Sequence, residues 1–374
     1  MGTFRVELKK TVDDSYEIEV GRALAGRLVK DLEGGLMGGL KKFALITDSN
    51  VEDLYAQPIC AALAEAGFEG QVFSFPAGEE SKTRETKAAL EDRMLEAGYR
   101  RDCFVIAVGG GVVSDLAGFL AGTYGRGVPF INYATTLLAA ADASVGGKTA
   151  VDTPLATNLI GLFNQPKKVY IDIDCWNTLP KREISGGLAE TVKHAVLADK
   201  EFFEYLEAHM EEIRAVSPGE CEYTARKNCE IKYQVVMKDE RETGLREVLN
   251  LGHTVGRAIE TVSGYRLQHG EAVSIGLVAA CTMSLRMGYM TEEDAGRVKA
   301  LLERAGLPVR IPAYIDREEL VKKLYTDKKV RNGRLRFVIP ECIGKIVEFA
   351  PGVFAEEVRE EAARQVILEM ETGD

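Results

Sequence analysis

Residues 104–149, FVIAVGGGVVSDLAGFLAGTYGRGVPFINYATTLLAAADASVGGKT, contain the pattern that decides the fold. The stretch opens as a continuous apolar run, breaks at three glycines (Gly109, Gly110 and Gly111) and resumes as a helix-like pattern after Asp115. This order predicts a buried strand, a tight turn and a helix. Glycines in such a turn let backbone N–H groups approach a phosphate closely, and the helix N-terminus adds partial positive charge.

The glycine triplet by itself has two interpretations. It is typical of a plain chain reversal as well as of a phosphate-binding turn. Lys148 and the pair Thr135 and Thr136 stand nearby in glycine- and alanine-rich surroundings. These three residues favour a nucleotide pocket.

Strand and helix patterns alternate through the first half of the chain. Apolar runs predict strands within 41–50 and at 71–76, 103–108, 130–134 and 167–173, and the stretches near 21–34, 51–66 and 83–98 predict helices. This alternation indicates an α/β fold with a mostly parallel sheet, in which ligands bind beyond the carboxyl ends of the strands. Before it, alternating residues at 4–8 and 16–20 predict an antiparallel strand pair.

The pattern changes around 175–187 and is mostly helical beyond. It predicts helices near 188–215, 218–240, 247–264, 270–288, 292–305 and 316–325, a short strand pair near 334–339 and 344–349, and a closing helix near 354–371. We therefore expect two domains, at 1–178 and 179–374, with the active site in the cleft between them.

Composition limits the partners of the protein. The chain has 374 residues and a net charge of −11, which argues against a nucleic-acid surface because such surfaces need clustered lysine and arginine. A few basic residues in a cleft would still attract a small anion. No stretch has the length and apolarity of a membrane span. Seven scattered cysteines without a C-x-x-C pair indicate reduced thiols and a cytoplasmic location.

Histidine is scarce, so each of the four residues can be weighed. His209 lies in a charged helical pattern, and we expect it on the surface. His253 in LNLGHT and His269 in LQHGEA stand where apolar runs meet glycine. With Glu190 in GGLAETVKH they would give an N,N,O ligand set that leaves an open position on a catalytic divalent metal. His194 lies four residues after Glu190 on the same helix face, and this spacing suits a ligand or a mere neighbour.

Several basic side chains stand beside glycine turns or polar segments. Together in one cleft they would suit a multiply anionic substrate, because phosphate and carboxylate favour charge-assisted contacts. They are Arg126, Lys148, Lys193, Lys232, Arg246, Arg257 and the pair Lys328 and Lys329.

Six segments, in order through nearly the whole chain, resemble the 3-dehydroquinate synthase family of sugar phosphate cyclases. They read GGGVVSDLAGFLAGTYGRG, TT, DASVGGKTAVD, GLAETVKH, DERETGLREVLNLGHTVG and LQHGEAVSIG. The resemblance implies an N-terminal NAD-binding Rossmann-like domain, a mostly α-helical C-terminal metal domain and a homodimer. It also implies NAD and zinc or cobalt as cofactors. The implied reaction converts 3-deoxy-arabino-heptulosonate 7-phosphate to 3-dehydroquinate and phosphate by transient oxidation, phosphate elimination, re-reduction and intramolecular aldol closure.

The same resemblance implies a role for individual residues. The metal ligands would be Glu190, His253 and His269, which leaves His194 a bystander. The NAD contacts would be Asp48, Asn50, Glu79, Lys82, the turn Gly110, Gly111 and Val112 through Asp115, Thr135, Thr136, Asp142 and Lys148. The substrate contacts would be Asp142, Lys148, Asn158, Lys193, Lys232, Glu242, Arg246, Asn250, Arg257, one of Lys328 or Lys329, and Arg126 from the neighbouring subunit.

Two positions depart from the family pattern. Thr157 in PLATN stands where the family usually has lysine, which predicts a weaker hold on NAD or a compensating contact. Arg257 ends GHTVGR where the family has histidine. Arginine grips phosphate with paired N–H groups but stays protonated, so it is a poor proton relay. We expect phosphate binding to survive and the proton to pass to water or to the leaving phosphate.

These departures leave other functions to weigh. A sister cyclase would use another sugar phosphate, such as sedoheptulose 7-phosphate. That substrate has no carboxylate to pair with Lys232 and Arg246, and unpaired buried cations are disfavoured, so we favour the carboxylated substrate. Metal-dependent polyol dehydrogenases share the glycine turn but not the DASVGGKT or DERETG segments. A binding protein would take up NAD or metal without releasing phosphate.

Overall fold

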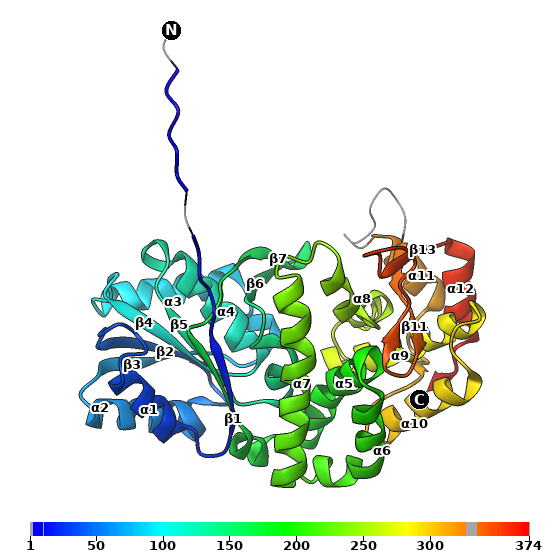
Figure 1. Ribbon diagram of the computed structural model, residues 1–374, viewed down its shortest axis with the longest axis horizontal. Coiled ribbons are helices and arrows are strands. Elements are labelled where there is room, and N and C mark those ends of the chain that lie inside the picture. Colours follow the sequence, from blue (N-terminus) through cyan, green and yellow to red (C-terminus); the bar gives the residue numbers. More distant parts are fainter. Residues whose placement is uncertain (1–2, 10, 327–334, 374) are drawn as a thin grey trace.

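The computed structural model describes residues 3–9, 11–326 and 335–373, and it combines a parallel sheet with a helical half (Figure 1). The six-stranded sheet has the order β1-β8-β5-β4-β2-β3, and all its neighbouring strands are parallel. Its strands are β1 (Glu17–Gly21), β2 (Lys42–Asp48), β3 (Glu69–Phe75), β4 (Cys103–Gly109), β5 (Phe130–Ala134) and β8 (Lys168–Asp172). The α/β fold class predicted from the sequence is confirmed.

Helices cover both faces of this sheet. Along β2, Phe43 and Leu45 belong to one buried cluster and Ala44 and Ile46 to another, as the two-residue period of a strand requires. The first cluster includes residues of α1 (Ala25–Glu33) and α2 (Gln57–Glu65), and the second includes residues of α3 (Arg84–Glu96) and α4 (Gly111–Thr123). A strand buried on both faces therefore appears in the sequence as a continuous apolar run.

The opening of the chain differs from the prediction. β1 pairs parallel with β8, and residues 3–9 form no strand, so the expected antiparallel pair of 4–8 with 16–20 is wrong. The turn residues Asp13 to Ser15 lead into an edge strand that continues the sheet. β1 pairs with β8 along its whole length, from Glu17 to Gly21.

A second difference lies after the glycine triplet. α4 begins at Gly111 itself, not after Asp115, so Asp115 lies in its second turn. An antiparallel hairpin of β6 (Lys148–Thr153) and β7 (Ala156–Phe163) then follows, which the glycine-rich sequence there did not indicate. Backbone contacts hold this hairpin beside Lys82, whose carbonyl accepts from the N–H of Asp152 at 2.7 Å.

The second half is built mainly of helices. Their bounds are α5 (Lys181–Ala198), α6 (Lys200–Arg214), α7 (Pro218–Lys238), α8 (His253–Val262), α9 (His269–Arg286), α10 (Glu292–Arg304), α11 (Arg317–Thr326) and α12 (Glu360–Glu369). The short strands are β9 (Ile311–Pro312), β10 (Leu335–Val338), β11 (Pro340–Cys342), β12 (Lys345–Ile346), β13 (Ala355–Val358) and β14 (Thr372–Gly373).

Four predicted elements of this half are corrected. The closing helix predicted at 354–371 begins instead with the strand β13, and α12 spans only Glu360–Glu369. The single helix predicted at 188–215 divides at Asp199, whose side chain accepts from the N–H of Phe202 at 2.9 Å and so begins α6. The helix predicted at 247–264 is a 3₁₀ turn followed by α8. β10 pairs with β13 rather than with 344–349, because the chain reverses at Gly352, where φ is 75°.

Within the ranges described above, no helix is both long and apolar enough to cross a membrane.

Candidate active site

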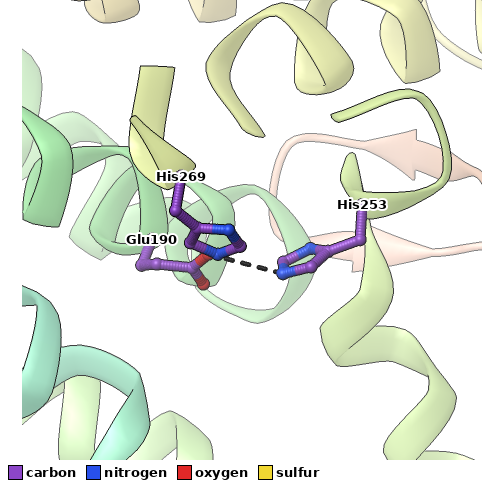
Figure 2. A group of neighbouring side chains, drawn as sticks. All are labelled: Glu190, His253 and His269. Atoms are coloured by element: carbon purple, nitrogen blue, oxygen red, sulfur yellow. Dashed lines mark ion pairs between the residues drawn. The ribbon is translucent and has the colours of Figure 1, made fainter. Parts of the chain in front are cut away.

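Three helices bring a carboxylate and two imidazoles together. Glu190 lies in the middle of α5, and His253 and His269 begin α8 and α9. The Nε2 atoms of His253 and His269 lie 3.6 and 3.5 Å from Oε1 of Glu190 (Figure 2). That oxygen is buried and has no hydrogen-bond partner. An oxygen and two nitrogens converging within 4.8 Å form a donor set that fits a divalent metal.

The outer nitrogens of the two imidazoles are also held. Nδ1 of His253 lies 3.2 Å from the carbonyl of Leu251, and Nδ1 of His269 lies 3.6 Å from a carboxylate oxygen of Glu260. Partners at Nδ1 leave Nε2 directed at Glu190, which is the usual way that proteins orient histidine ligands. Glu260 was not among the residues named from the sequence. The only sequence signal for it was its position about one helical turn after Arg257 on α8.

The local charges favour a cation at this point. Burial would lower the pKa of His269, but the carboxylates of Glu190 and Glu260 outweigh it and raise that pKa to about 10. Lys193, which is almost fully buried, pairs with the second carboxylate oxygen of Glu190. The donor set therefore fits a metal electrostatically as well as geometrically.

His194 has a different environment from the two other histidines. Its Nδ1 lies 3.1 Å from Oδ1 of Asn228, whose Nδ2 donates to the hydroxyl of Thr191 at 2.9 Å. Its Nε2 is buried without a partner. A ring nitrogen of His194 and carboxylate oxygens of Asp142 and Glu190 form a second group, whose atoms lie within 4.8 Å of one another. His194 is therefore a close neighbour of the metal donors, which its sequence position alone did not establish.

The glycine turn forms a cradle at the end of β4. A Cβ atom at Gly109 would lie 2.5 Å from Val113, and one at Gly110 would lie 3.1 Å from Thr136. The hydroxyl of Thr135 is buried beside it and has no partner. A turn that excludes side chains, a helix N-terminus and an unpaired hydroxyl suit a dinucleotide phosphate.

This cradle contacts the part of the chain that carries Asp142. A Cβ at Gly111 would lie 3.3 Å from Ala143, the last residue of the π-helical turn Ala139–Ala143. Asp142 in turn belongs to the group with Glu190. The π-helical turn Ala139–Ala143 therefore lies between the glycine turn and the metal donors. Single π-helical turns of this kind often occur at functional sites.

Lys82 connects several of the residues that the resemblance assigned to NAD. Its Nζ is buried and lies 2.6 Å from Asp115, 3.5 Å from Glu79 and 2.7 Å from Oδ1 of Asn158. Burial would lower the pKa of Lys82, but the two carboxylates raise it above the ordinary lysine value. Asn158, predicted as a substrate contact, thus lies with the cofactor residues.

Asp48 and Asn50 lie at the carboxyl end of β2. Oδ1 of Asp48 accepts from the backbone N–H groups of Asn50 and Val51, at 2.8 and 3.2 Å. Burial raises the pKa of Asp48. The exposed Asn50 follows in the loop, where a parallel sheet binds its ligands.

A second polar group surrounds Asp142. The ammonium of Lys232 donates to its carboxylate at 2.5 Å and also to its backbone carbonyl. Burial would raise the pKa of Asp142, but Lys232 and Lys193 hold it well below its usual value. Arg246, only 2% exposed, donates to the carbonyls of Glu240 and Gly146, and its Nε has no partner. Buried cations so close together suit an anionic ligand.

Lys148 joins a third set at the mouth of the hairpin. It pairs with Glu242, which also accepts from Nδ2 of Asn250 at 2.8 Å. Glu242 and Asn158 have positive φ angles, 59° and 53°, as does Arg126 at 74°. Strained backbone of this kind in non-glycine residues is concentrated at functional sites.

Some predicted residues are not joined to these groups. Arg126 is exposed, and Arg257 is half-buried one turn after His253 on α8; neither guanidinium makes an ion pair or hydrogen bond with any of the residues described. Thr157 is exposed on β7. Lys328 and Lys329 lie outside the described residues. His209, expected on the surface, is half-buried against the ring of Tyr205 at 4.4 Å.

Sequence reasoning also missed Asp239 at the end of α7. Its carboxylate accepts from the backbone N–H groups of Thr243, Gly244 and Arg246 at 2.8–2.9 Å. These bonds lower its pKa to about 2 against the opposing effect of burial. Asp239 therefore shapes the turn from which Arg246 reaches the site. Its position as the first residue of the DERETG segment was the available signal.

The fold and this site define a class of two-part α/β enzymes with a dinucleotide-type glycine turn and a helical metal site. Models of the N-terminal and C-terminal parts of 3-dehydroquinate synthase match residues 72–186 and 187–330. A 3-dehydroquinate synthase of Pelobacter propionicus is 45% identical over 337 residues, which cover 90% of this chain and 93% of that one. The chain belongs to the 3-dehydroquinate synthase family.

Two solved structures are similar over almost the whole chain. A 2-epi-5-epi-valiolone synthase from Streptomyces hygroscopicus subsp. jinggangensis 5008, with NAD⁺ and Zn²⁺ bound, is 28% identical with a TM-score of 0.85 and covers 98% of both chains. A 2-deoxy-scyllo-inosose synthase, complexed with carbaglucose-6-phosphate, NAD⁺ and Co²⁺, is 26% identical with a TM-score of 0.85, covering 94% of this chain and 96% of the other.

Proposed function

We propose that this protein converts 3-deoxy-arabino-heptulosonate 7-phosphate to 3-dehydroquinate and phosphate, acting as a carbon–oxygen lyase. The observation that carries the proposal is the pair of buried cations, Lys232 and Arg246, beside Asp142 and the Glu190 metal group. A carboxylated, phosphorylated sugar supplies the anions that such a cleft needs. The membership of the 3-dehydroquinate synthase family supports the same reaction.

NAD and zinc or cobalt are the cofactors in this proposal. Glu190, His253 and His269 would hold the metal, and the glycine turn with Thr135 would hold the NAD phosphates. When bound, the metal supplies Lewis acidity to a substrate hydroxyl, and NAD supplies a reversible acceptor of hydride. The bound NAD⁺ and Zn²⁺ or Co²⁺ of the two similar structures support this assignment.

The residues of the chain then hold the substrate and control its protons. Lys232 and Arg246 would bind the carboxylate, and Arg257 would bind the phosphate through paired N–H groups. Because a guanidinium group has no acceptor site for a proton, the proton that leaves the carbon next to the oxidised one would pass to the departing phosphate or to water. Holding both ends of the opened chain in one cleft would favour the final aldol closure.

The proposed enzyme works as a homodimer in the cytoplasm. The exposed Arg126, which contacts no polar group of its own chain among the described residues, would complete the phosphate site of the neighbouring subunit. Seven free cysteines agree with a reducing compartment.

A parallel assay of two substrates tests the proposal. The purified protein, loaded with zinc and NAD, is given the heptulosonate phosphate or sedoheptulose 7-phosphate, and phosphate, carbocyclic product and NADH are measured. We expect phosphate and carbocycle from the first substrate only, without net NADH. A carbocycle from sedoheptulose 7-phosphate alone would favour the sister cyclase, and accumulating NADH would favour a dehydrogenase.

A further inference from the structure

Tyr16 contacts the substrate-binding half of the site, although it was not among the residues named from the sequence. It directly precedes β1, and β1 contacts α7, the helix that carries Lys232 and leads toward Arg246. Its ring packs against the buried cluster that also includes residues of α1 and α2, and its hydroxyl accepts from the N–H of Gly146 at 3.0 Å. This hydrogen bond joins the start of the edge strand to the DASVGGKT segment.

Gly146 is held on its other side by Arg246. Nη2 of Arg246 donates to the carbonyl of Gly146 at 3.0 Å, and the two hydrogen bonds together fix both peptide groups that flank the Gly146 Cα atom. The φ angle of Gly146 is 96°, and a Cβ atom there would lie 2.4 Å from Nη2 of Arg246. The turn is therefore fitted closely around the guanidinium group.

Two backbone carbonyls set the orientation of this guanidinium group. Nη1 of Arg246 donates to the carbonyl of Glu240, and Nη2 donates to that of Gly146. Nε of Arg246 has no partner among the described residues. The two carbonyls thus fix the plane of the guanidinium group, and Nε–H is left to donate to an anionic ligand.

Tyr16 adds no charge to this arrangement. Burial raises the pKa of its hydroxyl, and the N–H of Gly146 and the charge of Arg246 lower it less. The hydroxyl is therefore protonated near neutral pH. Tyr16→Phe removes a hydrogen-bond acceptor without changing the charge beside Arg246.

We propose that Tyr16 is a positioning residue for the substrate carboxylate, acting through Gly146 on the guanidinium group of Arg246. The inference rests on the proposed function, in which Lys232 and Arg246 bind that carboxylate. Without the hydroxyl, the buried N–H of Gly146 loses this acceptor and the turn relaxes. The carbonyl that holds Nη2 then moves, and the guanidinium group loses the orientation in which its N–H groups match a carboxylate.

The effect is assigned to Arg246 rather than to Lys148, which follows the same turn. Lys148 is exposed and pairs with Glu242 at the mouth of the hairpin. Arg246 is buried and bonds to Gly146 directly. The shorter path from Tyr16 therefore leads to Arg246.

Steady-state kinetics test the positioning role. Tyr16→Phe should raise the KM for the heptulosonate phosphate about tenfold and keep kcat within about threefold, because a carboxylate remote from the reacting carbons contributes mainly uniform binding. Zinc content per chain and the dissociation constant of NAD should not change.

Tyr99→Phe is the matched control. The hydroxyl of Tyr99 also accepts from a backbone N–H, that of Gln71 at 3.1 Å, but it lies near the amino ends of β2 and β3, away from Arg246. This variant should lower the free energy of unfolding and leave the KM within about twofold of the wild type.

A second comparison shows whether Tyr16 acts through the guanidinium group. Arg246→Lys keeps the charge but lacks the forked N–H groups, so in this background Tyr16→Phe should raise the KM less than about twofold. Urea unfolding tests the same link without substrate. The midpoint shift of the double variant should be smaller than the sum of the two single shifts, because both changes act on Gly146.

Four results would overturn the proposal: an unchanged KM in Tyr16→Phe, an equal rise in Tyr99→Phe, an undiminished effect in the Arg246→Lys background, or additive midpoint shifts. A wild type that does not convert the heptulosonate phosphate would instead refute the proposed function. The unfolding measurements would still decide whether Tyr16 holds Arg246.

Discussion

Glu190 and His194 stand one turn apart on α5, yet their surroundings predict different consequences of removing them. Glu190 offers an unpaired oxygen to two imidazoles, whereas Nδ1 of His194 bonds to Asn228. Glu190→Ala should abolish retention of zinc on dialysis. His194→Ala should keep the metal but leave Oδ1 of Asn228 without its hydrogen-bond donor, lowering the free energy of unfolding by about 1–3 kcal/mol.

Metal content per chain and urea unfolding, measured on the same preparations, separate the two effects. His209→Ala, away from the site, is the control for loss of a histidine. Loss of zinc from the His194 variant with retention in the Glu190 variant would reverse the assignment of ligands.

Arg257 gives a prediction about pH. A guanidinium stays charged from pH 5.5 to 8.5, whereas an imidazole loses its charge around pH 6.5. In Arg257→His we therefore expect the KM for the phosphorylated substrate to rise as pH increases through this range. The ratio of the variant KM to the wild-type KM should increase about tenfold from the lowest to the highest pH. Steady-state kinetics at constant ionic strength provide the comparison. Parallel profiles would show that residue 257 does not bind the phosphate.

At the scale of elements, the metal site depends on how closely α5 and α9 approach. A Cβ atom at Gly270 would lie 2.2 Å from the carbonyl oxygen of Gly186, whereas a Cβ at Gly186 would meet nothing within 4 Å. Gly270→Ala should thus separate His269 from Glu190, lowering stability by about 1–3 kcal/mol and weakening zinc retention.

Gly186→Ala is the matched control for that change, since it alters the other side of the same contact. It should be neutral or stabilise α5 by up to about 1 kcal/mol, because alanine is the better helix former. Equal loss of zinc in both variants would contradict this account of the helix contact.

The turn after α7 gives a second prediction at this scale. Asp239 has a pKa of about 2, below the unfolded value of about 3.9. Its contribution to stability is therefore complete above about pH 4 and is lost as pH falls toward 2. Asp239→Asn should lower the free energy of unfolding by about 1–3 kcal/mol at pH 7, and the difference from wild type should shrink below pH 4. Urea unfolding at a series of pH values measures it, and a constant difference would count against the backbone hydrogen bonds as its cause.

The elements also show which parts of the fold the sequence could predict. Strands buried on both faces, such as β2 and β4, give continuous apolar runs, and the parallel order follows from the alternation with helices. The β6–β7 hairpin was missed because several of its apolar residues face solvent and blur the alternation of a strand: Leu155 is 92% exposed on its turn and Leu159 60% exposed on β7. The carboxylates of Asp199 and Asp239 accept hydrogen bonds from backbone N–H groups. Such bonds leave no pattern in the spacing of side chains along the sequence.

For the candidate site, residue types identified the group of Glu190, His253 and His269, since few histidines were available. The unpaired Nε2 of His194 and the support of His269 by Glu260 depend on helix packing angles. These emerge only when α5, α7, α8 and α9 are assembled.

At the scale of the whole molecule, the proposed sharing of Arg126 between subunits predicts complementation. Arg126→Ala and Lys193→Ala should each be nearly inactive. In a mixed dimer, one site combines an intact Lys193 with an intact Arg126 from the other subunit. Equal amounts that exchange subunits should recover about a quarter of wild-type activity, because half the dimers are mixed and each has one complete site.

The recovery should appear at the rate of subunit exchange. Mass spectrometry can show when the subunits of the two variants have fully exchanged. If no activity is recovered at that point, Arg126 acts in the site of its own subunit or in no site at all.

The hydrogen bonds behind His194 have a direction. Thr191 donates to the carbonyl of Gly187, which can only accept, so Thr191 must accept from Asn228, and Oδ1 of Asn228 must accept from Nδ1 of His194. Burial lowers the pKa of His194 to about 4, so near neutral pH the ring is uncharged and its one proton is on Nδ1. The tautomer is thereby set by a peptide group on the preceding turn of α5, and Nε2 is left as a buried lone pair without a hydrogen-bond partner. That corner of the site repels electron-rich atoms and accepts only cations or O–H and N–H groups.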